Sequence, residues 1–119
     1  SPDDNEVSMA RLPRFVIPGH PQHIIVRGNN REAIFYADED YAFYLERLME
    51  ACRKHGCECH AYVLMTNHVY LLLTSQLEGS ISKAIQMIGR YYVQYFSHKY
   101  HRTGTLWEGR YKSSNKHGY

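Results

Sequence analysis

One histidine in the sequence stands where it could take part in metal or phosphate chemistry. His68 follows the polar turn Thr66-Asn67 and begins the apolar run His68-Val69-Tyr70-Leu71-Leu72-Leu73, which predicts a β-strand. Side chains alternate between the two faces of a strand, so Tyr70 shares the face of His68. A second histidine at position 70 would complete a chelating pair for a divalent cation. A single imidazole with a neutral phenol is a weak site for Mg²⁺ or Mn²⁺, which favour several oxygen ligands and water.

His60 is a third candidate metal ligand. A strand predicted over about 58–64 forms a hairpin with the strand over 68–74. Depending on the register of the turn between them, His60 and Tyr62 share a face with the first two candidates. The alternative interpretation is that His68 is a structural histidine at the start of a strand, whose hydrogen bonds are satisfied by its neighbours.

The three cysteines, Cys52, Cys57 and Cys59, are expected to be reduced thiols in the core. Their number is odd, and Cys57 and Cys59 would lie on one face of a single strand, where they are poorly placed to bridge each other. A zinc site that combines these two thiolates with a nearby histidine is the alternative, although structural zinc sites usually show C-x₂₋₄-C spacing.

The elements that must position these residues follow from the hydrophobic pattern. Residues 22–27 are β-branched and end in the turn Gly28-Asn29-Asn30. A stripe with helical spacing predicts a helix that begins at Asp38 as N-cap and stops at Gly56. Its apolar members are Tyr41, Tyr44, Leu45, Leu48 and Cys52.

A second stripe predicts a helix over about 80–98, with Ser80 as its cap. Its apolar members are Ile81, Ala84, Ile85, Ile88, Tyr92, Tyr95 and Phe96. The glycine-punctuated tail over 104–114 predicts an edge strand. The order strand, helix, strand, strand, helix, strand favours an α+β, ferredoxin-like sandwich, with an antiparallel sheet of four or five strands and two helices on one face. The other face of the sheet would stay open for function.

The composition is that of an ordinary soluble globular domain, at 119 residues, 44% hydrophobic and 22% charged. No run approaches the roughly 20 apolar residues of a membrane helix, and the acidic start does not resemble a signal peptide. We therefore expect a cytoplasmic protein with no membrane partner. Met9 resembles a native start, so residues 1–8 are expected to be a disordered leader or tag remnant. Without them, 14 basic residues face 9 acidic ones, which is compatible with a polyanionic partner.

Two groups of polar residues are candidates for nucleic-acid contacts. The first is Arg27, Asn29, Asn30 and Arg31, around the turn after the first strand. Guanidinium and backbone N–H groups there suit phosphates or base edges, whereas a simple polar turn leaves the two arginines unexplained. The second is Arg90, Lys99, Arg102, Arg110 and Lys112, interleaved with Tyr91, Trp107 and Tyr111. Cations between aromatic rings suit single-stranded nucleic acid, and a role for Trp107 in capping the core is the alternative.

The stretch His60-Ala61-Tyr62-Val63-Leu64-Met65-Thr66-Asn67-His68-Val69-Tyr70-Leu71-Leu72 closely resembles the segment around the HUH motif (histidine, hydrophobic residue, histidine) of single-tyrosine transposases. Within that family it is most similar to the REP-associated tyrosine transposases. Three further segments, 23–31, 35–44 and 104–113, agree in order and spacing. The resemblance covers nearly everything from Met9 to Ser114.

The resemblance implies a transposase domain that binds hairpin or single-stranded repeat DNA and acts in DNA transposition and recombination. In the family, the two motif histidines and a third ligand hold one divalent cation, Mg²⁺ or Mn²⁺, which polarises the scissile phosphate. A tyrosine on a later helix attacks and becomes joined to the 5′ phosphate, and the strands are then rejoined. Because relatives include monomers and intertwined dimers, a homodimer remains open.

Carried onto this sequence, His68 falls on the first motif histidine and Tyr70 on the second. The family's nucleophilic tyrosine lies in a helix beyond the 107–112 region, in a Tyr-Ile-Glu-Leu-Asn-like string that the chain does not contain. Tyr119 and Tyr111 are the remaining candidate nucleophiles, although neither lies in the sequence string expected for the family. We therefore expect residues 9–119 to form a transposase-like domain that lacks the nucleophile's helix and is impaired in cleavage.

Two other functions compete with this expectation. The first is a non-catalytic DNA-binding protein derived from such a transposase. The second is an RNA-binding module that uses an open sheet, but the predicted strands lack the paired aromatic residues of such modules, so it ranks last.

Overall fold

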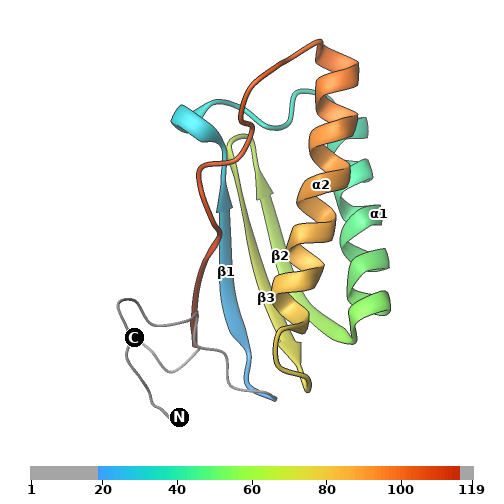
Figure 1. The fold of residues 1–119 in the computed structure, drawn as a ribbon, viewed down its shortest axis with the longest axis vertical. Helices are drawn as coiled ribbons and strands as arrows, with labels where there is room; N and C mark the ends of the chain where they lie inside the picture. Colours follow the sequence, from blue (N-terminus) through green and yellow to red (C-terminus); the bar gives the residue numbers. More distant parts are fainter. Residues whose placement is uncertain (1–18, 116–119) are drawn as a thin grey trace.

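The computed structural model describes residues 19–115 as a sheet covered on one face by two helices (Figure 1). The elements are β1 (Gln22–Arg27), η1 (Asn29–Arg31), α1 (Asp38–His55), β2 (Cys57–Met65), β3 (His68–Ser75), α2 (Ser80–Tyr100) and β4 (Lys112–Asn115). The strand order is β2-β3-β1-β4 and every pairing is antiparallel. The predicted α+β, ferredoxin-like sandwich is confirmed with four strands, and β4 is the edge strand expected in the tail. Residues 1–8, the expected leader, lie outside the described residues.

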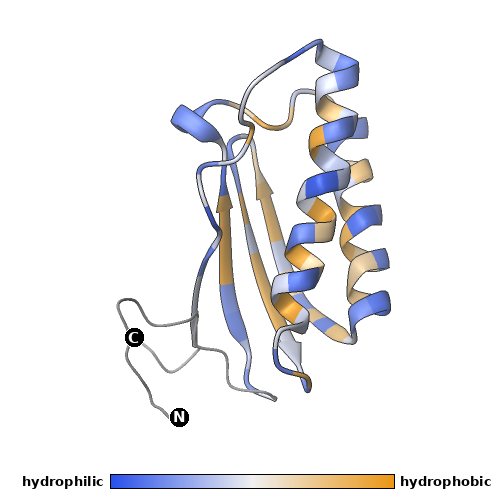
Figure 2. Cartoon of the chain, viewed as in Figure 1, coloured by the Kyte–Doolittle hydropathy of each residue, from blue (hydrophilic) through white to orange (hydrophobic). Residues whose placement is uncertain are grey.

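The alternation of side chains in β1 and β3 separates a core face from an open face. Ile24 lies opposite Leu71, and both are buried under the helices. On the other face, Arg27 lies opposite His68 and Ile25 lies opposite Tyr70. Figure 2 shows hydrophobic residues along β1, β3 and both helices, as expected for a core between the two layers. The candidate site residues of β1 and β3 therefore share the open face.

The helix starts differ from the prediction by one residue each. Ala37, not Asp38, is the N-cap of α1, because the carboxylate of Asp40 accepts the backbone N–H groups of Tyr36 and Ala37, both at 2.9 Å. Gly79 in a left-handed conformation precedes α2, so Ser80 is its first helical residue and not its cap. The predicted end of α1 is confirmed, since Gly56 is its C-cap with φ +70°.

Aromatic side chains fill the core between the helices and the sheet. Tyr92 is fully buried, and its ring lies 5.4 Å from that of Phe35 and 5.5 Å from that of Tyr44. Its hydroxyl donates a hydrogen bond to the carbonyl of Ile34. The assignment of Tyr92 to the core is confirmed, whereas Tyr95 is only half-buried and has a polar role described below.

The three thiols are free, as expected for reduced core cysteines. Cys57 and Cys59 lie opposite Ser75 and Leu73, so both face the helices. Within residues 19–115, no group of three His, Cys, Asp or Glu side chains is placed to hold a metal ion, which does not support the zinc alternative. Neither described helix is long and apolar enough to cross a membrane.

Candidate nucleic-acid interface

A polar pocket of about 430 Å³ lies where β1 ends and β3 begins. Gly28 and six polar or charged residues line it: Arg27, Arg31, Asn67, His68, Glu108 and Lys112. Arg27 and His68 are direct cross-strand neighbours on the open face, and Lys112 is the first residue of β4, on the other side of β1. Segments that are far apart in the sequence thus place three cationic side chains, those of Arg27, Arg31 and Lys112, around one pocket beside His68.

The turn after β1 is held between two other segments of the chain. The N–H of Gly28 donates to the carbonyl of Asn67 at 2.9 Å, and the N–H of Asn29 donates to the carbonyl of Leu106 at 2.8 Å. A Cβ atom at Gly28 would lie 2.4 Å from the carbonyl oxygen of Glu32, so a side chain cannot be accommodated without a shift of the backbone. This close approach explains the glycine.

Asn67 orients the candidate histidine and was missed by the sequence analysis. Its Oδ1 lies 2.7 Å from Nδ1 of His68, a contact that calls for a proton on Nδ1 and leaves the Nε2 lone pair of the neutral ring available. Its Nδ2 donates to the carbonyl of Arg31 at 3.4 Å. The one sign of this role in the sequence was the position of Asn67 in the hairpin turn, directly before His68.

The structure places two of the three predicted metal ligands, His68 and Tyr70, side by side and the third, His60, apart from them. The rings of His68 and Tyr70 meet edge to face with centroids 5.0 Å apart. His60 lies at a β-bulge, where its Nε2 is 2.6 Å from Oγ1 of Thr74. Thr74 is six residues beyond His68, or roughly 20 Å along a strand. Tyr62 lies opposite Leu71, so the register does not place it on the face of Tyr70.

These donors do not fit Mg²⁺ or Mn²⁺. Tyr70 supplies a phenol, and its neighbours across the open face are Ile25 and Val63, which offer no donor. Glu108 supplies the one carboxylate among the residues that line the pocket with His68. A hard divalent cation favours several oxygen ligands, and the described residues contain no suitable group of three His, Cys, Asp or Glu.

A second, smaller pocket continues the first. It has a volume of about 250 Å³ and shares Arg27, Glu108 and Lys112 with its neighbour, while Arg110 adds a further cation. The segment between the pockets is anchored by a 2.8 Å hydrogen bond from the N–H of Glu108 to the carbonyl of Arg27. We call the two pockets together the basic cleft. It contains four of the predicted DNA-binding residues: Arg27, Arg31, Arg110 and Lys112.

Comparison with known proteins identifies the family. Residues 18–118 match the family model described as "Transposase IS200 like". The chain belongs to this family. The resemblance to transposases drawn from the sequence is confirmed. No curated protein matches the chain.

Solved structures show the same fold as this IS200-like transposase. One is a REP-associated tyrosine transposase bound to a REP hairpin, with a TM-score of 0.68, 18% identity and coverage of 93% of this chain. The present chain spans 64% of that protein's length. Another is a candidate transposase from Deinococcus radiodurans R1, with a TM-score of 0.65, 19% identity and coverage of 87% of this chain and 84% of the other.

Other residues predicted to bind DNA lie outside the basic cleft. Asn29 and Asn30 belong to the turn beside it but do not line it. Arg90 and Trp107 line a separate pocket next to α2. Trp107 is half-buried and its Nε1 donates to the carbonyl of Gly89 at 3.4 Å, which agrees with the core-capping interpretation. Tyr119 lies outside the described residues.

The two other basic residues of the second predicted group, Lys99 and Arg102, form ion pairs with acidic side chains. Arg102 forms a 2.7 Å ion pair with Glu32. Lys99 contacts Glu39 at 2.6 Å and Asp40 at 2.8 Å. Neither cation lines the basic cleft. The prediction therefore placed in one group residues that the fold separates.

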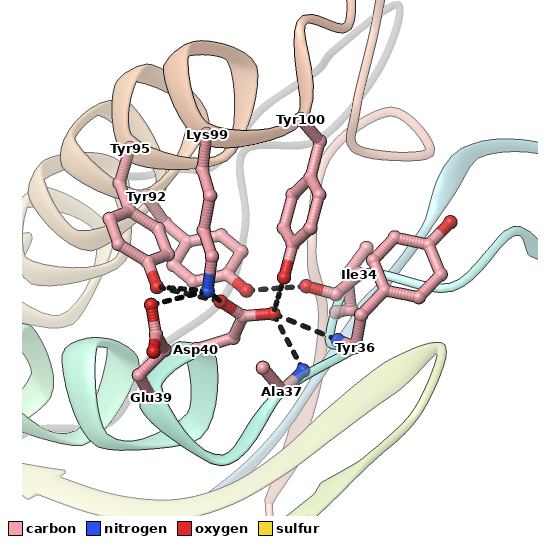
Figure 3. Close-up of polar contacts among 9 residues, drawn as sticks. All are labelled: Ile34, Tyr36, Ala37, Glu39, Asp40, Tyr92, Tyr95, Lys99 and Tyr100. Carbon is pink, nitrogen blue, oxygen red and sulfur yellow. Dashed lines mark hydrogen bonds and ion pairs between the residues drawn. The ribbon is translucent and has the colours of Figure 1, made fainter.

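A buried carboxylate in this IS200-like transposase was also missed. Asp40 is fully buried and accepts hydrogen bonds from the hydroxyls of Tyr95 and Tyr100, both at 2.6 Å, and from Lys99 (Figure 3). Burial disfavours its charged form, but these donors and the N–H of Tyr36 outweigh that cost and hold the pKa of Asp40 well below its usual range. We name Asp40, Tyr95, Lys99 and Tyr100 the Asp40 cluster. None of its members lines the pockets described above.

Proposed function

We propose that this IS200-like transposase chain binds hairpin or single-stranded DNA through the basic cleft. The observation that carries the proposal is the convergence of Arg27, Arg31 and Lys112 on one pocket beside His68. Cationic side chains from separate elements suit the closely spaced charges of a DNA backbone, and guanidinium groups form paired hydrogen bonds with phosphate oxygens. The REP hairpin bound by the similar transposase structure supports the same class of ligand.

The proposal includes impaired strand cleavage. Family members cleave and rejoin DNA with a divalent cation, but Tyr70 replaces the second motif histidine and leaves a weakened site for Mg²⁺ or Mn²⁺ around His68. The residues of this chain would hold the backbone through Arg27 and Lys112 and orient the imidazole through Asn67. A non-catalytic DNA-binding protein is the second candidate, and the same poor donor set favours it.

The binding proposal is tested by fluorescence anisotropy with a labelled DNA hairpin across a series of salt concentrations. Arg27→Ala and Lys112→Ala should each weaken binding and lower the slope of log K against log salt by about 1, the value for one lost phosphate contact. Lys54→Ala, at the exposed end of α1, removes the same charge outside the cleft and should leave the slope unchanged. Equal effects of all three substitutions would refute a localised site.

Cleavage is tested separately with the same hairpin carrying a label at its 3′ end, on the fragment that would stay joined to the protein through its 5′ phosphate, in the presence of Mn²⁺ or Mg²⁺. We expect no covalent protein–DNA product on a denaturing gel. A covalent product from this chain would show that its cleavage activity is intact. If the chain binds the hairpin without forming such a product, and the Tyr70→His variant behaves in the same way, the result favours the non-catalytic candidate.

A further inference from the structure

A third pocket lies between α2 and the segment over 107–111, and its volume is about 620 Å³. Val26, which is buried on the helix-covered face of β1, lines this pocket. The basic cleft lies on the opposite, open face, with Ile25 and Arg27. The third pocket is therefore a separate site. We propose that it binds a small aromatic carboxylate, an inference that goes beyond the proposed function and does not depend on it.

The walls of the third pocket suit a planar apolar molecule. Ile85 and Val93 of α2 and Val26 of β1 supply apolar surface, and Tyr44 and Trp107 supply aromatic surface. An aromatic ring that enters removes apolar area from water and packs against the two aromatic side chains. The volume falls in the range of pockets that enclose small ligands. A site of this size and lining accommodates one molecule with a few fused or linked rings.

Trp107 forms a wall that is fixed by the protein itself. Its Nε1 donates to the carbonyl of Gly89 at 3.4 Å, and its backbone pairs with Gly28 in an isolated β-bridge. A Cβ atom at residue 89 would lie 3.3 Å from Nε1 of Trp107. The absence of a side chain at Gly89 thus lets the indole lie close against α2. A wall that is already in place lowers the entropic cost of binding a ligand.

The polar groups of the third pocket favour an anionic ligand. Arg90 and Arg110 line it, and none of the described residues that line it is acidic. Within residues 19–115, neither guanidinium forms an ion pair with an acidic side chain. Gln86 and Gln94 lie one turn of α2 before and after Arg90 and add amide donors. Guanidinium groups bind the two oxygens of a carboxylate through paired hydrogen bonds, so the charge of the pocket complements one such group.

Trp107 also makes the inference testable in the full chain, because it is the only tryptophan in the sequence. The first probe is anilinonaphthalene sulfonate, whose sulfonate oxygens stand in for those of a carboxylate. The second is phenylnaphthylamine, which has the same aromatic body without the charge. We expect both probes to bind with energy transfer from Trp107, and we expect naphthoate to displace them.

Substitutions locate the binding site. Val93→Phe fills the pocket and should abolish binding of both probes. Val63→Ser is its control, because Val63 is 53% exposed among apolar residues of the open face, where such probes could also bind, and it should change neither affinity. Melting curves confirm that both variants are folded.

A second pair of variants tests recognition of the charge and does not disturb the core. Arg90→Gln should weaken binding of the sulfonate probe about fivefold, the upper value for an exposed ion pair, and leave the uncharged probe unaffected. Lys83→Gln removes the same charge from an exposed position of α2 outside the pocket and should affect neither probe.

Three results would overturn the inference. If Val63→Ser abolishes binding and Val93→Phe does not, the probes bind the open face. If Arg90→Gln weakens both probes equally, the pocket does not recognise the anionic group. If a short single-stranded oligonucleotide displaces the probes and naphthoate does not, the pocket takes nucleic acid. Hairpin binding through Arg27 and Lys112 is measured separately, so the proposed function stands or fails on its own.

Discussion

Lys99 Nζ lies 2.8 Å from Asp40 Oδ1 and thereby joins the last turn of α2 to the first turn of α1 (Figure 3). The two residues are 59 positions apart in the sequence. Asp40 is fully buried, while Lys99 keeps a quarter of its side chain exposed and also reaches Glu39. Hydrogen bonds and charge therefore hold this end of the helix pair, whereas apolar packing holds the rest.

Loss of the Asp40 carboxylate should destabilise the fold. Asp40→Ala leaves the hydroxyls of Tyr95 and Tyr100 and two backbone N–H groups without their acceptor, so we expect the free energy of unfolding to fall by about 2–4 kcal/mol. Urea denaturation measures this change. Asp38→Ala, an exposed position in the same turn, should cost less than about 1 kcal/mol. Similar losses at both positions would mean that the helix dipole, and not the Asp40 cluster, accounts for the stability.

The Asp40 cluster also predicts loss of stability in acid. The pKa of Asp40 is lower in the folded than in the unfolded chain, so the unfolded chain takes up the proton first as the pH falls. The contribution is present at neutral pH and should decrease progressively below about pH 5. The measurement is the difference in Tm between the wild type and Asp40→Asn across this range, which removes the effect of other carboxylates. A difference that does not shrink in acid would contradict the prediction.

Gly28→Ala should disturb the basic cleft and the fold together. The new Cβ would lie 2.4 Å from the carbonyl oxygen of Glu32 and 2.9 Å from Cγ2 of Ile34, which forces the turn to move. We expect a loss of about 1–3 kcal/mol, typical of overpacking, and weaker hairpin binding. Asn30→Gly is the control in the same turn, because residue 30 has φ +56°, which glycine adopts readily. Equal stability of Gly28→Ala and the wild type would show that the backbone has room to relax.

Tyr70→His should improve metal binding. It places a second imidazole on the open face, two residues from His68, where the family has its second motif histidine. We expect the affinity for Mn²⁺, measured by titration calorimetry, to rise by at least about tenfold, since even changes to the partners of metal ligands alter affinity by 10–100-fold. Tyr91→His is the matched control, because Tyr91 is 42% exposed and Tyr70 is 41% exposed. No difference between the two variants would mean that position 70 does not face a metal site.

The sequence predicted best what depends on local pattern. The β-branched run of β1 and the helical stripe that contains Tyr44 and Leu48 each identify an element and its buried side without reference to distant residues. The order of these elements then leaves few ways to cover one face of the sheet. The family resemblance added the expected role of His68.

The features that the sequence did not predict depend on partners far away in the chain. No local pattern distinguishes Asp40 from its acidic neighbours Asp38 and Glu39, because Tyr95, Lys99 and Tyr100 meet it only through the packing of α1 against α2. The bulge at His60 moves that side chain toward Thr74, and no local pattern marks its position. Likewise, Lys99 and Arg102 looked like part of a cationic surface until their acidic partners were located.

The basic cleft joins side chains from the first and last strands of the sheet. Arg27 ends β1, Lys112 begins β4, and the pairing of these strands brings the two residues to one pocket. During synthesis, a chain that has emerged only as far as α2 has the hairpin and both helices but not the complete cleft. Under the proposed function, affinity for DNA would therefore be acquired late, after β4 has been translated and paired. A ribosome-bound chain truncated before residue 112 would fold most of its core without binding the hairpin tightly.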